Sequence, residues 1–355
     1  MSDNKLENRY INDLKRLEYT SNQTIFRLSN WGTVLVAILF LLLTGICVDF
    51  FISDKIDNKI LLIIAAVIGG YMALNIGAND VANNMGPAVG GKVLTITTAV
   101  IIAAICEAAG ALLAGGDVVK TVSKGIIMVD SSISTENFRY LMLSALLSAA
   151  LWINLATILN APVSTTHSIV GGVLGAGLAA AGMNIVNWLT MSKIAASWVI
   201  SPVLGGIIAA SFLFFITTKI INKKDKVNAA RKWIPVLIAV MAAAITAYMT
   251  IKGFKKVYKA SIEEIISYTI FVAVVTFIFS KPWTNKKLLS LKNEKKDIYT
   301  LFNFPLIIGV ALLCFAHGAN DVANAVGPLA AIVSTFNDTN EIASKVSIPF
   351  WVMFI

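Results

Sequence analysis

Long apolar runs, separated by short polar stretches, dominate the pattern of the chain. A helix that crosses the hydrocarbon core of a bilayer needs about 20 mostly apolar residues. We count about eight runs that approach or exceed this length, at 31–52, 60 to about 78, 93–115, 138–160, 194–221, 233–250, 262–280 and 305 to about 320. The pattern therefore predicts an all-α, polytopic membrane protein.

The composition agrees with this fold class. Apolar residues make up 57% of the chain and charged residues 14%, whereas soluble domains carry about 25% charged residues. The formal net charge of +9 comes mostly from Lys and Arg in short loops, where these residues mark the cytoplasmic side of a membrane. Nucleic-acid binding is therefore not expected. The three cysteines, Cys47, Cys106 and Cys314, lie inside apolar runs and predict neither a disulfide framework nor a metal cluster.

The distribution of Lys and Arg predicts the orientation of the runs. The stretches 219–232 and 281–296 hold six each, and five precede residue 31, so we expect all three on the cytoplasmic side. The run from 60 then starts outside, and the run from 305 starts inside. We divide the chain into a charged tail (1–30), an extra transmembrane helix (31–52), a first repeat (60–221), a basic linker with connecting transmembrane helices (222–304) and an incomplete second repeat (305–355).

Two of the runs carry the same polar motif. The sequence GANDVAN occupies 77–83 and again 318–324, and Gly-Pro follows each copy at 86–87 and 327–328. In a helix, the two asparagines of each copy lie on one face, with the aspartate beside them. The flanking Gly and Pro predict that each helix is broken near the motif, as in inverted-repeat secondary transporters. Hydrogen bonding between helices is the structural alternative, but a duplicate of seven residues favours a ligand site.

A third polar segment, APVSTTHS at 161–168, opens the stretch 161–183. We interpret this stretch as a re-entrant hairpin, with a simple crossing as the alternative. Its proline and hydroxyl side chains are typical of a helix start, where N–H and hydroxyl donors meet an oxyanion. His167 and His317 are the only histidines, and each is either a packed core residue or a proton-sensitive site residue.

Glu107 interrupts another apolar run, IIAAICEAAGALL. An unpaired carboxylate at the centre of a bilayer costs about 2.5–3.5 kcal/mol, so we expect a cation or a proton as its partner. A structural pair is the alternative. Helix N-termini and Asn amides donate to anions, whereas carboxylates and carbonyl oxygens suit small hard cations. The polar motifs and Glu107 together predict an anion site beside a cation site.

The segments GANDVANNMGP, GANDVANAVGP and APVSTTHS closely resemble, in order, the signature segments of the inorganic phosphate transporter (PiT) family. The resemblance covers 60 to about 331 and implies a multi-pass phosphate permease of a plasma membrane, the inner membrane in bacteria. Sodium or protons would be the coupling ion, no cofactor is expected, and a homodimer is one candidate assembly. The implied phosphate-binding residues are Asn79, Asp80, Asn83, Ser164, Thr165, Thr166, His167, Ser168, Asn320, Asp321 and Asn324. The implied cation-coupling residues are Asp80, Glu107 and Asp321, and the implied sodium ligands are Asn79, Asp80, Asn320 and Asp321.

The sequence departs from the family pattern in two places. It ends at IPFWVMFI, before a second STTH hairpin or a counterpart of Glu107, so we interpret it as truncated within the second repeat. We expect a version completed with that hairpin to transport, and this chain not to. The helix at 31–52 also precedes the usual start of the fold.

Three alternatives stay open beside a phosphate permease. The first is a permease for another oxyanion, above all sulfate. The second is an intramembrane hydrolase that uses Ser164, His167 and Asp80. The third is a non-transporting remnant with a structural or receptor role.

Overall fold

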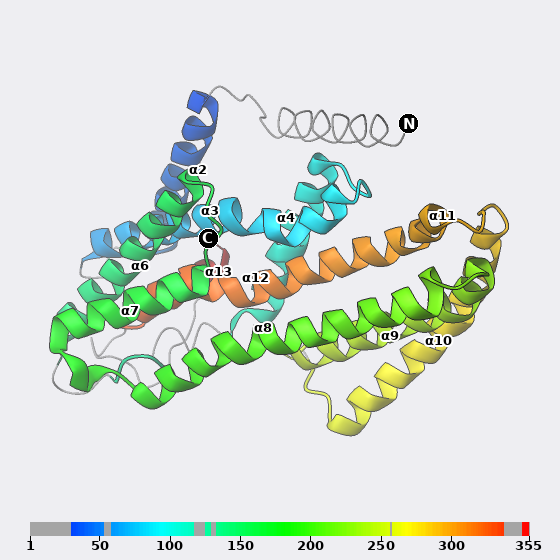
Figure 1. The fold of residues 1–355 in the computed structure, drawn as a ribbon. Helices are drawn as coiled ribbons and strands as arrows, with labels where there is room; N and C mark the ends of the chain where they lie inside the picture. The colour runs from blue at the N-terminus through cyan, green and yellow to red at the C-terminus, as the bar shows by residue number, and fades with distance from the viewer. Residues whose placement is uncertain are drawn as a thin grey trace, which may run out of the picture.

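The computed structural model describes residues 30–52, 58–116, 125–128, 133–255, 258–336 and 350–354, so the charged tail predicted at 1–30 lies almost entirely outside the described residues. The described part is helical and contains no strand (Figure 1). Its helices are α2 (Asn30–Phe51), α3 (Lys59–Gly90), α4 (Ile96–Ala114), α6 (Thr135–Ile158), α7 (Thr165–Ala181), α8 (Trp188–Ile216), α9 (Lys226–Tyr248), α10 (Ile262–Leu288), α11 (Lys295–Tyr299), α12 (Asn303–Val333) and α13 (Phe350–Phe354).

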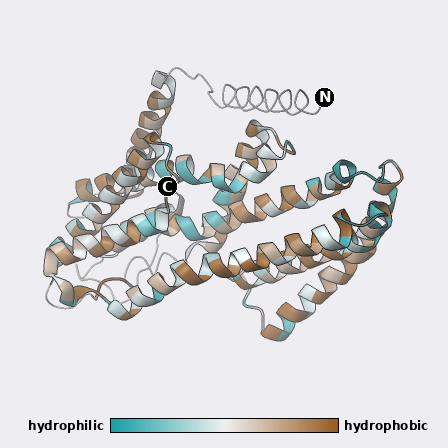
Figure 2. Ribbon diagram, in the orientation of Figure 1, coloured by the Kyte–Doolittle hydropathy of each residue, from teal (hydrophilic) through white to brown (hydrophobic). Residues whose placement is uncertain are grey.

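Eight of the described helices are long and apolar enough to cross a membrane. Hydrophobic residues cover most of every long helix, and hydrophilic residues gather at the loops beside α11 (Figure 2). In a helix the backbone satisfies its own hydrogen bonds, which makes it one of the few structures that a bilayer tolerates. Several helices also begin with a side chain that accepts from a free backbone N–H, namely Thr95, Ser134, Ser164, Asn187, Asp225 and Ser261. The all-α membrane fold is thus confirmed.

The helices α6 and α7 pack against each other as the two arms of a hairpin. The chain just before α6 is hydrogen-bonded to the chain just after α7, from Met128 N to Ile185 O (2.7 Å) and from Asn187 N to Ile126 O (2.9 Å). The second arm of the hairpin therefore ends at the same end of the bundle at which the first arm begins. The stretch 161–183 supplies only the tip and the second arm, because the first arm is α6.

The tip of this hairpin lies beside Asn79, eleven residues before α3 ends at Gly90. At 1.5 Å per residue, the tip stops about 16 Å short of that end. Because the hairpin enters and leaves at the same side of the membrane, it does not change the side on which the chain continues. The helices α3, α4 and α8 therefore make the three crossings of this part of the chain. This arrangement agrees with the orientation that the basic loops predict.

The helices α3 and α12 run antiparallel through the centre of the bundle. Along α3, Gly69 faces Leu329, Asp80 faces His317, and Gly91 lies near Leu306. Both helices are continuous through their GANDVAN motifs, so the breaks predicted there are absent. The reason is that the polar side chains find partners on neighbouring helices, so the motif does not require the backbone to open.

The main core lies where α3, α6, α7 and α12 meet. Arg139, in the first turns of α6, ties this core to the end of α12. Its guanidinium donates to the hydroxyl and carbonyl oxygens of Thr335 (2.7 and 2.8 Å) and lies 3.8 Å from the ring centre of Phe336. This contact fixes the hairpin against α12.

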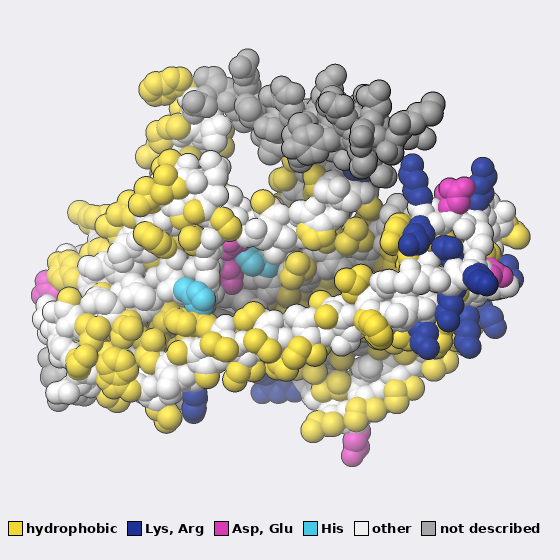
Figure 3. Space-filling model, in the orientation of Figure 1, with side chains coloured by type: hydrophobic (Ala, Val, Ile, Leu, Met, Phe, Trp, Pro, Cys, Tyr) yellow, Lys and Arg dark blue, Asp and Glu magenta, His cyan; other side chains and the backbone are white. Residues whose placement is uncertain are grey.

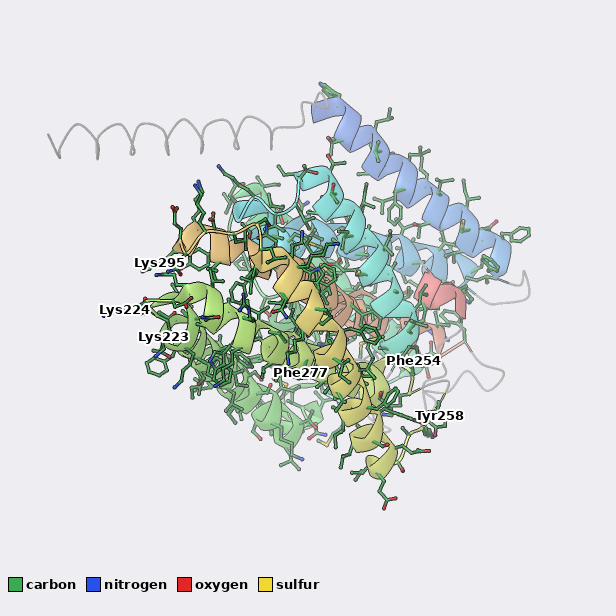
Figure 4. All side chains as sticks on the ribbon, turned by 90° about the vertical axis from the view of Figure 1, so that its right-hand side faces the viewer. Lys223, Lys224, Phe254, Tyr258, Phe277 and Lys295 are labelled. Atoms are coloured by element: carbon green, nitrogen blue, oxygen red, sulfur yellow. The ribbon has the colours of Figure 1, made fainter. Side chains whose placement is uncertain are left out.

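Basic side chains gather at one end of the molecule, over the ends of α9, α10 and α11 (Figure 3). Lys223, Lys224 and Lys295 lie at this end, and Phe254 and Tyr258 lie at the opposite end of the α9–α10 pair (Figure 4). Because Lys and Arg mark the cytoplasmic face, this is the end that we predict to be cytoplasmic.

Candidate functional site

The hydroxyl of Thr165, at the start of α7, joins the aspartates of the two motifs. Its Oγ1 lies 2.8 Å from Asp321 Oδ2 and 3.2 Å from Asp80 Oδ2. A hydroxyl has one proton, so it can donate fully to only one of these carboxylates at a time. The antiparallel packing of α3 and α12 brings both aspartates to the same depth, and the hairpin tip delivers the hydroxyl between them.

Asn324 and Thr166 extend this cluster along α12 and α7. The Asn324 amide donates to Thr165 Oγ1 and Thr166 Oγ1, both at 3.1 Å. Ser164 and Ser168 are used within α7: the Ser164 hydroxyl accepts from His167 N (3.2 Å), and the Ser168 hydroxyl donates to Ser164 O (2.8 Å). The four hydroxyls of the motif therefore divide between capping the helix and contacting α3 and α12.

The imidazole of His317 lies among three carboxylates from three helices. Its Nε2 is 3.1 Å from Asp321 Oδ2 and 3.5 Å from Asp80 Oδ2, and its Nδ1 is 3.2 Å from Glu107 Oε1. These four side chains are 11–19% exposed. Asn84 donates to the same Glu107 oxygen at 3.0 Å. Three carboxylates beside one imidazole form a strongly cation-attracting cluster in surroundings of low polarity.

The remaining asparagines of the two motifs differ in their surroundings. The Asn79 amide donates to Thr157 Oγ1 (2.9 Å) and Ala161 O (3.2 Å), and its oxygen accepts from Val163 N (3.2 Å). Asn79 therefore holds the hairpin tip. Asn83 is exposed, and Asn320 lines a cavity.

Two cavities with different linings meet at Asp321. The hydroxyl cavity, of about 590 Å³, is lined by residues that include Ser164, Thr166, His167, Asn320, Asp321 and Asn324. The acidic cavity, of about 360 Å³, is lined by residues that include Gly77, Glu107, His317, Gly318 and Asp321. Acidic and histidine side chains lie close together at the middle of the molecule in Figure 3. Asp321 thus lines both a cavity with several hydrogen-bond donors and a mostly apolar cavity that also holds Glu107 and His317.

The structure therefore brings together nearly all of the residues that the sequence singled out. It also adds His317, for which the sequence alone allows either a core or a site role, and Asn84. Both signals were present in the sequence: His317 directly precedes the second GANDVAN, and Asn84 directly follows the first. Only the packing of α4 against both α3 and α12 reveals that they meet at Glu107.

Comparisons with known proteins point to one family. The model of the phosphate transporter family matches residues 76–355. A Helicobacter pylori protein named "Putative phosphate permease" is 48% identical over 326 residues, which are 91% of this chain and 61% of that protein. A Pyrococcus abyssi protein of the same description is 38% identical over 297 residues, 82% of this chain and 71% of its own length.

A solved structure, described as the sodium-dependent phosphate transporter, is also similar. It superposes with a TM-score of 0.75 at 38% sequence identity, over 83% of this chain and 72% of its own. The present chain spans about 61% of the length of the Helicobacter pylori protein.

Proposed function

Since the chain belongs to the phosphate transporter family and spans about 61% of the length of a relative, we propose that it is part of a permease that binds inorganic phosphate and moves it across a membrane together with sodium or protons. One observation carries the proposal: Asp321 lines both the hydroxyl cavity and the acidic cavity. The anion would occupy the first cavity and the coupling cation the second. We also propose a bacterial inner membrane as its location, in line with its similarity to a Helicobacter pylori protein.

The hydroxyl cavity suits phosphate better than a fully ionised anion. Its lining offers the Asn320 and Asn324 amides and the Ser164 and Thr166 hydroxyls. Near neutral pH, inorganic phosphate keeps at least one proton, because its second ionisation lies close to neutrality and its third lies far above it. The Asp321 carboxylate can accept a hydrogen bond from that P–OH group, but it can only repel sulfate. Sites built around a substrate's OH reject an analogue that lacks it by roughly 10⁴-fold.

The acidic cavity suits a small cation. Oxygens of Asp80, Glu107 and Asp321 surround His317 within 3.5 Å, and hard cations prefer such oxygen ligands. Sodium and the proton are both candidates: the similar solved structure is described as sodium-dependent, and an imidazole among carboxylates can hold a proton. The predicted ligands Asp80 and Asp321 belong to this cluster, whereas Asn79 is engaged by the hairpin tip.

The hydrolase alternative has little support in this geometry. His167 packs its ring on Trp198, with the ring centres 4.0 Å apart, and Asp80 contacts Thr165 and His317. A nucleophilic serine needs a base within hydrogen-bond reach, and among the described residues the Ser164 hydroxyl is bonded only to the backbone N–H of His167. A permease for another oxyanion and a binding remnant are the alternatives that the experiment below has to separate.

The test is phosphate binding and uptake by the purified chain in proteoliposomes, with sodium, with choline, and across an imposed pH gradient. We expect saturable phosphate binding that sodium or a proton gradient strengthens, and little competition from sulfate. Equal competition by sulfate would favour the other-oxyanion permease. Uptake by this chain alone would contradict the expectation that it does not transport. Binding without uptake by a version completed with the second hairpin would favour the remnant, and the absence of phosphate binding would contradict the proposal.

A further inference from the structure

The helix α8 forms a wall of the hydroxyl cavity that the sequence motifs do not identify. Its residues Ile194, Ser197, Trp198, Ser201 and Pro202 line the cavity opposite the hairpin and α12. Four of them follow the i, i+3, i+4, i+7 spacing of a single helix face. Elsewhere α8 stands clear of the bundle, since Met191 is the one buried residue among Trp188–Ile216. The face toward the cavity carries the half-buried Ile194 and Trp198 and the exposed Ser197, Ser201 and Pro202.

The hydroxyls on this face add two more polar groups to the lining of the cavity. Ser197 and Ser201 are one turn apart and share the cavity with Thr166, Asn320 and Asn324. The Ser197 hydroxyl is bonded to Ile194 O at 2.6 Å, from which it can rotate toward a ligand. Ser201 has no side-chain partner among the described residues. A tetrahedral oxyanion in the cavity would thus meet donors from α7 and α12 on one side and from α8 on the other.

Two further features adapt α8 to this role. Pro202 lies inside the helix, and because proline lacks an N–H, the carbonyl of Trp198 loses its usual helical partner beside the cavity. The Trp198 ring meets the His167 ring at 4.0 Å between centres and 63° between planes. This contact joins α8 to the first turn of α7, where the donors from the hairpin lie.

We propose that Ser197 and Ser201 bind the transported anion from α8, and that Trp198 is a positioning residue that holds His167 and α7 against the cavity. The inference rests on the proposed function, because it assumes that phosphate occupies the hydroxyl cavity. By this proposal, residues of α8, which lies outside the duplicated motifs, contribute to the affinity for the anion.

Protection of introduced cysteines by phosphate tests the location. In the chain with Cys47, Cys106 and Cys314 replaced by alanine, S197C, S201C and T166C are labelled with a small charged thiol reagent, with and without inorganic phosphate. We expect phosphate to slow labelling at all three sites. S192C is the matched control, because the Ser192 hydroxyl is also bonded to a carbonyl three residues earlier (2.9 Å) but does not line the cavity.

Each outcome of this experiment has a distinct meaning. Protection at T166C without protection at S197C and S201C would overturn the inference and leave the proposed function standing. No protection at T166C would contradict the proposed function, and the inference with it. If S197C or S201C is not labelled even without phosphate, this face of α8 does not line an aqueous cavity, and the inference would also be overturned.

Affinity measurements test the roles. S197A and S201A should each weaken phosphate binding by about 2- to 10-fold, as expected for the loss of one hydrogen bond, and S192A should not. W198A should weaken binding at an unchanged melting temperature, and W198F, which keeps a ring beside His167, should restore it. A W198A variant that binds phosphate as tightly as the parent, or a lowered melting temperature in both Trp198 variants, would remove Trp198 from this role.

Discussion

Gly318 on α12 lies so close to Glu107 on α4 that an added Cβ atom would overlap the Glu107 carbonyl. Gly110 is placed in the same way against Phe315, one turn along the same contact. The two backbones are thus in direct contact, as small residues allow between membrane helices. This contact sets the depth at which Glu107 and His317 meet.

We predict that G318A and G110A destabilise the protein by about 1–3 kcal/mol, because extra atoms in a packed contact force the helices apart. The measurement is the melting temperature in detergent, which should fall for both variants. G309A is the control on the same helix, since a Cβ atom there would meet nothing within 4 Å. An equal melting temperature for G318A and G309A would contradict the close contact.

Glu107 should carry the dependence on the coupling ion. E107Q keeps a side-chain oxygen that can accept from Asn84 but removes the negative charge beside His317. We therefore expect phosphate binding by E107Q to lose most of its response to sodium or to pH. E263Q, at an exposed glutamate in the first turn of α10, should behave like the parent. If E107Q keeps the full response, Glu107 is a structural residue.

The two motif aspartates should set the preference for phosphate over sulfate. D321N and D80N remove acceptors for the phosphate OH and convert each carboxylate into an amide. We expect at least one variant to bind phosphate about tenfold more weakly, which corresponds to about 1.4 kcal/mol, and to discriminate less against sulfate. Competition between the two anions is the measurement. Wild-type discrimination in both variants would assign the aspartates to the cation alone.

Asn79 and Asn83 should differ in the kind of defect that their loss causes. N79A leaves the hairpin tip without three hydrogen bonds, so we expect a lower melting temperature together with weaker phosphate binding. Asn83 is exposed in the same motif, so N83A should leave the melting temperature unchanged. A decrease in phosphate affinity in N83A at constant stability would support the binding role that the sequence predicts for it.

The sequence predicted the spans better than the path of the chain. Runs of apolar residues and a repeated seven-residue motif are local signals, and the motif includes several of the side chains that meet around Thr165 and His317. The first arm of the hairpin was not recognised, because α6 is as long and apolar as a crossing helix. Only the pairing of Ile127 with Val186, nearly 60 positions apart, reveals that the chain turns back.

The continuity of α3 and α12 was missed for a related reason. Gly and Pro near a polar motif predict a broken helix when the partners of the polar groups are unknown. Thr165 lies 156 residues from Asp321, and Glu107 lies more than 200 residues from His317. These partners belong to the tertiary structure, and no local pattern in the sequence reports them.

The place of Asp321 between the two cavities has a thermodynamic consequence for the proposed transport. If both ligands interact with this one carboxylate, the affinity gain must be reciprocal: a cation that strengthens phosphate binding tenfold is itself held tenfold more tightly by phosphate. A form loaded with phosphate alone would place the anion beside three carboxylates without a cation to compensate them, and uncompensated charge in the bilayer is costly. Movement of phosphate would then be favoured only when the cation is also bound, which suppresses leakage of the anion on its own.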